Sequence, residues 1–348
     1  MQKSGEIKGR VKFRVKDRPY VLPLLLLVFI LTFFISFALG RYPVDPITLV
    51  KILLSRIIPL EETWSSQAET VVFNIRLPRV LIGAFIGAGL SLSGLVYQGI
   101  FQNPMVSPDV LGSTSGAAAG SALGILAGMG YFSISAMSFL GGITAVLIVL
   151  MIARRVPGQP VLGLVLSGIM ISSLFNSLLS FIKLVADTDD VLPQITYYLI
   201  GSLSSTRNSD LAACALLITV PAIVLYLIRW NLNVMTLGEE EAVSLGVNTK
   251  AIRFTAVVCA TLMTAVSTAA AGMIGWIGLV IPHLVRMSIG CDYRKTIPAT
   301  ILMGSSFLML VDTVSRNLTT SEIPIGILTS FIGAPFFLYL IIREGKKT

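Results

Sequence analysis

The sequence is poor in charged residues and has a single histidine. Only 13% of its 348 residues are Asp, Glu, Lys or Arg, about half the share found in ordinary soluble domains. Hydrophobic residues make up 54%, and the mean hydropathy is +0.85. Too few polar side chains are available to cover a soluble fold, whereas a bilayer accepts helices that are apolar all round. We therefore expect an all-α polytopic membrane protein.

Residues that commonly carry chemistry are also scarce. The three cysteines lack the spacing of a disulfide framework or a zinc site, and His283 has no His or Cys near it in the sequence. No Walker A sequence or nucleophile elbow is present. The net charge of +8 is spread along the chain instead of forming a basic patch, which argues against nucleic acid. We expect no catalysis, no cofactor and no bound metal in this chain, and interpret His283 as a packing or helix-end residue.

Stretches without ionisable side chains predict ten membrane-spanning helices, because a charge at mid-bilayer costs at least about 2.5 kcal/mol. The first, 19–40, exceeds the apolar core of a cleavable signal peptide, so we expect a permanent helix. The uncharged stretch 110–153 is expected to divide at Gly128-Met129-Gly130. The stretch 254–285 should break near Ala271-Gly272 into a seventh span and most of a short eighth. Segment 191–203 is too short to cross and is expected at the interface. The remaining predicted spans are 80–102, 161–182, 211–228, 296–314 and 323–342.

Basic residues indicate the orientation of the chain. Segment 1–18 is strongly basic, and most of the 26 Lys and Arg lie on its side of the membrane when ten crossings are drawn. The positive-inside rule then places both termini in the cytoplasm of a cell with the protein in its cell membrane. The expected layout is a basic N-terminus at 1–18, a ten-helix domain at 19–343 and a tail at 344–348. Its long connections are 41–79 outside and 229–253 inside.

Glycines recur every four residues from Gly112 to Gly128 in the predicted third span. Small residues at this spacing let helix backbones approach closely, so this span is expected at the centre of the bundle. Ser107 can cap the helix, Pro108 suits its first position and Asp109 favours its positive end. The sequence thus predicts a third helix that begins near Pro108 and forms a tight hairpin with the second.

The inner connection contains a short predicted helix. Glu239, Glu240 and Glu241 stand at its start, Gly246 stands at its end, and Asn248 can cap the following span. The segment is either a solvated helical linker or a docking element for a cytoplasmic partner.

The outer ends of spans two and nine carry arginines. Arg76 and Arg79 open span two, while Asp312 and Arg316 are four residues apart on span nine and can pair along one helix face. These residues are either membrane-edge cations with an intrahelical ion pair or a cationic surface that receives an acidic protein partner.

Three blocks of the sequence carry a family resemblance. The first runs from Arg76-Leu77-Pro78-Arg79 to Asn103-Pro104-Met105, and the second holds Leu237-Gly238-Glu239 with Leu245-Gly246. The third extends from Gly275-Trp276-Ile277-Gly278 through Pro282-His283-Leu284-Val285-Arg286 to Gly333-Ala334-Pro335. In these blocks, and in its ten predicted spans, the chain resembles the transmembrane permeases of bacterial ABC importers for iron-siderophores, haem and cobalamin.

The resemblance implies the type II ABC importer permease fold, in which two permease subunits enclose a translocation path. The second subunit would be an identical copy or a similar paralogue. Two cytoplasmic ATPase subunits would bind ATP and Mg²⁺, so this chain itself would not be an enzyme. An extracytoplasmic binding protein would deliver the substrate.

The resemblance also implies roles for individual residues. Docking of the binding protein falls on Arg76, Arg79 and Arg316, and span five would line the path. The cytoplasmic gate falls on Asn103, Met105, Gly158, Pro160 and Val161. Coupling to the ATPase falls on the segment that contains Leu237, Gly238, Glu239, Glu240, Ala242, Leu245 and Gly246.

The substrate is not written in the residues. Within the resembled family a ferric siderophore is the expected cargo, with haem and cobalamin as alternatives. An ion-coupled secondary transporter is the main alternative class, although the predicted spans hold few acidic residues for an ion relay. A membrane enzyme is disfavoured by the lack of an acid, base, nucleophile or metal cluster.

Overall fold

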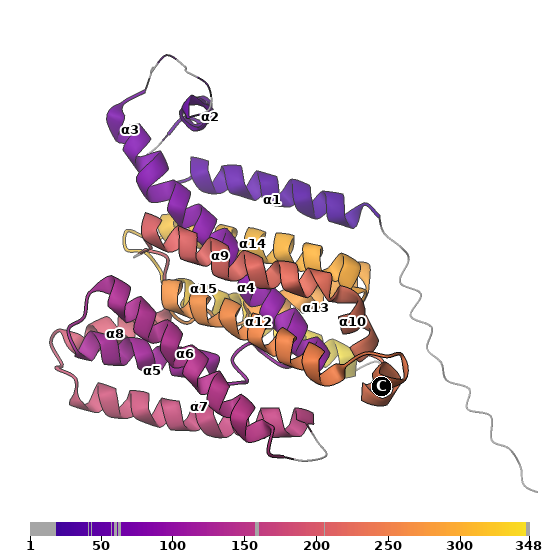
Figure 1. The fold of residues 1–348 in the computed structure, drawn as a ribbon. Helices are drawn as coiled ribbons and strands as arrows, with labels where there is room; N and C mark the ends of the chain where they lie inside the picture. Colours follow the sequence, from indigo (N-terminus) through magenta and orange to yellow (C-terminus); the bar gives the residue numbers. More distant parts are fainter. Residues whose placement is uncertain are drawn as a thin grey trace, which may run out of the picture.

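The computed structural model describes residues 19–345 apart from positions 41, 43, 57, 59–60, 62–63, 157–159 and 205. This part of the chain consists of helices and turns, with no strand among the described residues (Figure 1). The predicted segment 1–18 and residues 346–348 of the predicted tail lie outside it. The helices are α1 (Val21–Ala38), α2 (Pro46–Ser55), α3 (Ser66–Thr70), the π-helical η1 (Val71–Arg76), α4 (Leu77–Ile100), α5 (Ser113–Leu126), α6 (Tyr131–Ala153), α7 (Pro160–Val185), α8 (Val191–Ile200), α9 (Asn208–Leu227), α10 (Arg229–Met235), α11 (Glu239–Ser244), α12 (Thr249–Ala271), α13 (Ile277–Ile289), α14 (Tyr293–Asn317) and α15 (Ile325–Gly345).

Each of the ten predicted spans falls on one helix, but these helices differ in length. Within the described residues, seven helical stretches are long and apolar enough to cross a membrane. They contain α1, α4, α6, α7, α9, α12 and α14. Predicted spans three, eight and ten coincide with α5, α13 and α15. Since α5 has 14 residues and α13 has 13, and about 20 are needed for a full crossing, the count of ten crossings stays a prediction.

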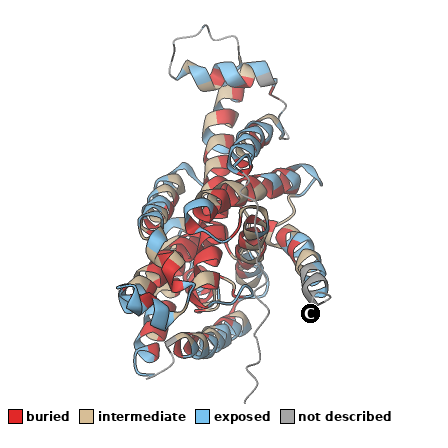
Figure 2. Cartoon of the chain, turned by 90° about the vertical axis from the view of Figure 1, so that its right-hand side faces the viewer, coloured by how far each residue is buried: buried red, intermediate tan, exposed pale blue. Residues whose placement is uncertain are grey.

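Helix α4 lies at the centre of the bundle, where it packs against α14, α12, α13 and α9. Of the most apolar 18 residues in the stretch that contains α4, 89% are buried, against 28% of those in α1. Figure 2 shows the buried residues gathered in the middle of the bundle. Glycines allow this central position: a Cβ on Gly87 would lie 2.3 Å from the Gly304 carbonyl oxygen, and one on Gly94 1.9 Å from that of Gly278. Helix α5, which the sequence predicts at the centre, is also largely buried, and its main contacts are with α6, α7, α12 and α8.

Three of the five glycines of the third-span repeat, Gly116, Gly120 and Gly124, face α6. Gly116 meets the backbone of Gly141, and Gly120 that of Met137, so α5 packs closely on α6 and also contacts α7. The predicted hairpin with the second span is wrong in consequence. The predicted helix start at Pro108 is wrong too. The Ser107 hydroxyl bonds the Asp109 carboxylate instead of capping backbone, and the helix begins only after Gly112.

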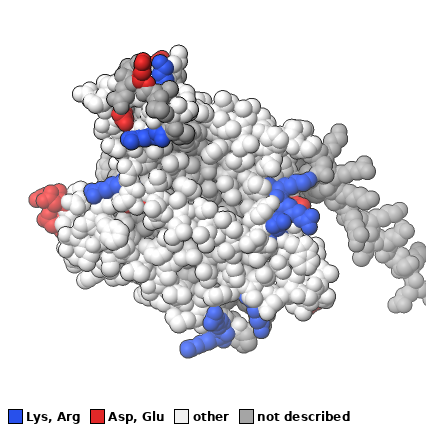
Figure 3. All heavy atoms as spheres, turned by 45° about the horizontal axis from the view of Figure 1, so that its top comes forward, with Lys and Arg blue, Asp and Glu red and all other residues white. Residues whose placement is uncertain are grey.

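Charged side chains avoid the middle of the molecule. Figure 3 shows a broad surface without Lys, Arg, Asp or Glu, with such residues gathered at its margins. This distribution is the one expected for a surface that faces lipid. One margin carries α2 and the turn between α14 and α15, and the opposite margin carries α10 and α11 (Figure 1).

Candidate functional site

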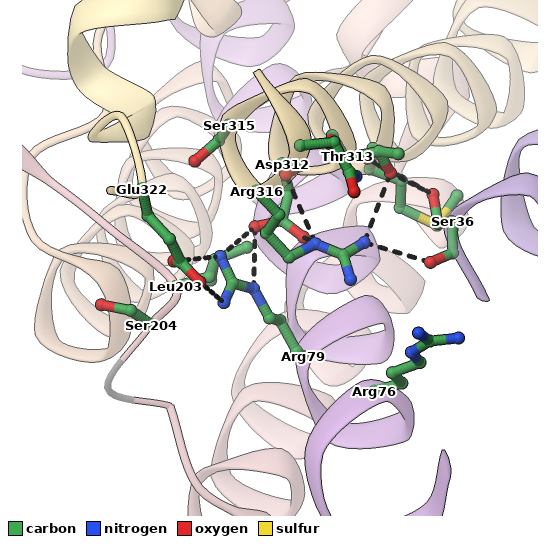
Figure 4. Close-up of polar contacts among 12 residues, drawn as sticks. Ser36, Arg76, Arg79, Leu203, Ser204, Asp312, Thr313, Ser315, Arg316 and Glu322 are labelled. Carbon is green, nitrogen blue, oxygen red and sulfur yellow. Dashed lines mark hydrogen bonds and ion pairs between the residues drawn. The ribbon is translucent and has the colours of Figure 1, made fainter. Parts of the chain in front are cut away.

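Four charged residues form one network at the end of the bundle that the sequence predicts to lie outside, called the outer end below (Figure 4). Arg79, in the first turn of α4, donates from Nε to Asp312 Oδ1 at 2.9 Å. Its Nη1 and Nη2 donate to the two carboxylate oxygens of Glu322 at 3.1 and 2.9 Å. Arg316 Nε lies 3.0 Å from Asp312 Oδ2, which confirms the predicted pair one turn apart on α14. Asp312 thus bridges two arginines, and we call Arg79, Asp312, Arg316 and Glu322 the outer cluster.

Arginines also fasten α1 to this end. Arg316 Nη2 donates to the Ser36 carbonyl at 3.1 Å. Arg76 donates to the carbonyls of Phe37 and Tyr42, just inside and beyond the end of α1. The network therefore joins α1, α4 and α14, three elements distant in the sequence.

The three predicted docking arginines meet at this end but are not open to solvent. Arg76, Arg79 and Arg316 are 3%, 7% and 7% exposed, and Asp312 is 2% exposed. Buried guanidinium groups need carboxylate partners with good geometry, because removal from water is costly. Arg76, Arg79 and Arg316 carry three positive charges and Asp312 and Glu322 two negative ones, so this group of five residues has a net charge of +1.

Glu322 was missed by sequence reasoning. It lies in the turn between α14 and α15, in a short link between two apolar segments. A single acid in such a link, at the same end as three arginines, is a signal that could have indicated it. The sequence gives no indication of Ser36, because this residue takes part in the network mainly through its backbone carbonyl, which accepts from Arg316.

The inner connection forms a second site. Helix α11 begins after Gly238, whose φ of +130° suits glycine, and it is followed by Gly246 with a φ of +79°. Glu239 Oε2 accepts from Arg253 Nη2 at 3.0 Å, and this hydrogen bond lowers the pKa of Glu239 below its ordinary value. Asn248 Oδ1 accepts from the Ala251 N–H at 3.1 Å, which confirms the predicted cap of α12.

The predicted coupling residues divide between the two faces of this element. Ala242 is fully buried and packs with Val234 and Val247. Leu237, Val243 and Leu245 are instead more than half exposed. Glu240 is also exposed. The result is a small helix anchored by one face, with an apolar surface presented by the other.

The predicted gate residues lie beside this element. Asn103 and Met105 follow α4, Val161 is in the first turn of α7, and all three line one groove of about 710 Å³ together with Glu239. Gln102 Nε2 donates to the Met235 carbonyl at 3.1 Å and ties the turn after α4 to α10. Of the other predicted gate residues, Pro160 begins α7 and Gly158 lies outside the described residues.

These features define a multi-helical membrane protein. In the described part of the chain no group of three or more His, Cys, Asp or Glu side chains is placed to hold a metal. The two candidate sites lie at opposite ends of an apolar bundle, one a buried charged network and the other a short helix with exposed side chains.

Residues 26–343 match the FecCD transport family, and the chain belongs to that family. It is therefore the permease component of an ABC importer, a class that works with ATPase and substrate-binding partners in a membrane and is not itself enzymatic. This confirms the family resemblance found in the sequence.

Named relatives differ in what they carry. The chain is 36% identical to the molybdate import system permease protein MolB of Haemophilus influenzae, over 88% of this chain and 90% of that protein. It is 40% identical to an iron chelatin transport system permease protein of Helicobacter pylori, over 80% and 84%. It is 38% identical to the cobalamin import permease BtuC of Halobacterium salinarum, over 81% and 76%.

A solved structure shares the fold. An inward-facing conformation of a metal-chelate type ABC transporter superposes with a TM-score of 0.84 at 35% sequence identity, covering 94% of this chain and 100% of that one.

Proposed function

We propose that the chain forms, with a second permease subunit, the translocation path of an importer for metal chelates, with a ferric siderophore as the first candidate. Haem and cobalamin are the alternatives within this class. The second subunit is another copy of this chain or a similar paralogue. The proposal rests most on one face of α7.

Four exposed polar residues on α7 form this face. Ser173, Asn176, Ser177 and Ser180 are spaced three, one and three residues apart, so they lie on one side of the helix. The three serine hydroxyls donate to carbonyls one turn earlier in α7. The exposed Asn176 amide is unfavourable against lipid tails and suits a water-filled path or a subunit contact. We call these four residues the α7 stripe and place it on the path.

The α7 stripe carries no charge. Between Pro160 and Val185 the only ionisable side chain is Lys183, in the last turn of the helix. A path lined by hydroxyl, amide and apolar groups does not select its cargo by charge. This lining suits large chelates of differing charge, with selection left to the binding protein, and agrees with the variety of cargo in the names of the relatives.

The two candidate sites supply the remaining steps. The binding protein docks at Arg76, Arg79 and Arg316 through its own carboxylates. An ATPase subunit, which holds ATP and Mg²⁺, receives the exposed apolar side chains of α11. Because Glu239 shares a groove with Asn103 and Met105, movement of α11 reaches the gate directly and changes which side of the path is open.

Uptake by cells with this chain as the only permease of its class tests the cargo. We expect accumulation of ⁵⁵Fe delivered as a ferric siderophore, abolished by vanadate and retained with an uncoupler. Uptake of molybdate instead of the iron chelate would overturn the cargo, and loss with the uncoupler but not with vanadate would indicate a secondary transporter.

The α7 stripe is tested by Asn176→Leu. We expect uptake to fall while the melting temperature of the purified protein is unchanged. Thr219→Leu, at an exposed position of α9, makes the same kind of change elsewhere on the surface and should leave uptake intact. Equal uptake by both variants would remove α7 from the path.

A further inference from the structure

Helix α2 is a fixed part of the outer end. Asp45 Oδ2 accepts from the N–H groups of Ile47 and Thr48 at 3.1 and 3.3 Å, and Pro46 occupies the first turn, so the helix has a complete N-terminus. Leu49 and Ile52 are 2% and 0% exposed and pack in the cluster that includes Phe37 of α1 and Val72 of η1.

The other side of α2 is apolar and uncovered. Ile47 is 69% exposed, Val50 43% and Leu54 40%, and Ile58 beyond the helix is 50% exposed. Their spacing of three, four and four residues places them on one face. We call these four residues the α2 stripe. No other part of the described chain covers them.

Helix α2 also runs across the direction of the bundle. In Figure 1, α1, α7, α9 and α12 run across the page while α2 is seen end-on, and in Figure 2, turned by 90°, α2 is seen along its length. If α1 follows the membrane normal, α2 lies parallel to the membrane surface at its outer boundary. Amphipathic helices that bind bilayers adopt this orientation.

The surroundings of the α2 stripe favour lipid over protein as the occupant. Helix α2 contacts α1, a predicted membrane span whose exposed residues near the same end, Leu31, Phe34 and Ile35, are apolar, so the stripe continues an apolar surface expected to face lipid. Lys51 is exposed on α2. Arg56, with a 67% exposed side chain, is held at the helix end by Glu69 at 3.3 Å and by the Phe73 ring at 4.8 Å. Basic groups at this position can reach lipid phosphates.

We infer that α2 is an interfacial membrane anchor, with the α2 stripe inserted at the boundary between headgroups and acyl chains of the outer leaflet. Lys51 and Arg56 bind the phosphates of anionic lipids. The anchor fixes the depth of the outer end of α4, because α2 is packed against η1, which leads directly into α4.

Fluorescent labelling tests the anchor. A nitrobenzoxadiazole label is attached to Val50→Cys and, as matched control on the same segment, to exposed Glu61→Cys, both in a Cys291→Ser background because Cys291 is exposed. The full chain is reconstituted in vesicles of phosphatidylethanolamine and phosphatidylglycerol with 5-doxyl lipid. We expect blue-shifted emission and several-fold stronger quenching at position 50 than at position 61.

Hydroxyl-radical footprinting of the unmodified protein gives a second readout that needs no variant. In these vesicles, without any added protein, hydroxyl radicals should modify Ile47, Val50 and Leu54 less than other exposed side chains. Equal quenching at positions 50 and 61, or unprotected Ile47 and Val50, would overturn the anchor. Protection that arises only with the binding protein, or label-to-label proximity between two copies, would assign the stripe to that protein or to a second copy and would equally overturn it.

Discussion

The two ends of the bundle differ in how their charged side chains are placed: they are buried and paired at the outer end and largely exposed at the inner end. At the outer end, Arg79, Asp312 and Arg316 are buried, and each is paired within the chain. At the inner end, Glu239 keeps one ion pair while Leu237 and Leu245 are exposed. The outer cluster is therefore part of what holds the helices together, whereas the inner element is a surface presented to a partner. Substitutions should accordingly change stability at one end and association at the other.

Asp312→Asn should have the largest effect. It leaves two buried guanidinium groups with half of their compensating charge, and breaking a buried ion pair costs about 3–5 kcal/mol. We expect a marked fall in the melting temperature of the purified protein in detergent. Asp292→Asn, at the cap of the same helix, should cost less than about 1 kcal/mol because Asn also caps well. Similar melting temperatures for both variants would contradict a clamp at the outer end.

Val243→Ser combined with Leu245→Ser should act on association alone. Burial of each side chain in a partner contributes about 1.5–3 kcal/mol, so co-purification with the ATPase should fall at least about tenfold. The stability of the chain should change by no more than about 0.5 kcal/mol, as for other exposed sites. Leu227→Ser, at the exposed end of α9, is the control that should retain the ATPase. An undiminished complex in the double variant would contradict docking at α11.

Glu322→Gln sharpens the comparison at the outer end. The variant removes one carboxylate partner of Arg79, so the net charge of the group formed by Arg76, Arg79, Arg316, Asp312 and residue 322 rises from +1 to +2. If a binding protein docks through carboxylates, its affinity should rise by about 0.5–1 kcal/mol, or about two- to fivefold, at low salt. The gain should shrink as ionic strength rises. Arg79→Gln should shift affinity the other way, and unchanged docking in both variants would leave the outer cluster a purely structural clamp.

Acid should weaken the inner element, and this is the smallest effect. Because the pKa of Glu239 is lowered in the folded chain, its pair with Arg253 stabilises α11 above the ordinary glutamate pKa of about 4.3. That contribution is lost as the pH falls through the lowered value. The protection of amides in 239–246 against hydrogen exchange, taken relative to the intrinsic rate at each pH, should therefore fall only below about pH 4.3. Glu239→Gln should abolish this pH dependence, and a transition near pH 6 would assign it to another group.

Local features of the fold could be predicted from the sequence. The cap at Asn248, the break at Gly272 and the short helix between Gly238 and Gly246 depend on a few adjacent residues, and the structure confirms all three. The ion pair of Asp312 and Arg316 belongs to the same class, since both residues lie on one helix face.

Features that depend on distant segments could not be predicted. Helix α4 is central because its glycines meet Gly278 and Gly304, and the spacing of glycines within one helix does not reveal the partner. The shared groove of Asn103 and Glu239 joins residues 136 positions apart in the numbering. The burial of Arg79 requires Glu322 from a different turn. In each case a packing partner, rather than a local preference, decides the structure.

The close backbone contacts of α4 also bear on how the molecule moves. Gly94 and Gly278 leave no room for a side chain between α4 and α13, and Gly87 and Gly304 leave none between α4 and α14. Packed interfaces of this kind shift between discrete arrangements instead of deforming gradually. We therefore expect α4, α13 and α14 to move together in any opening motion.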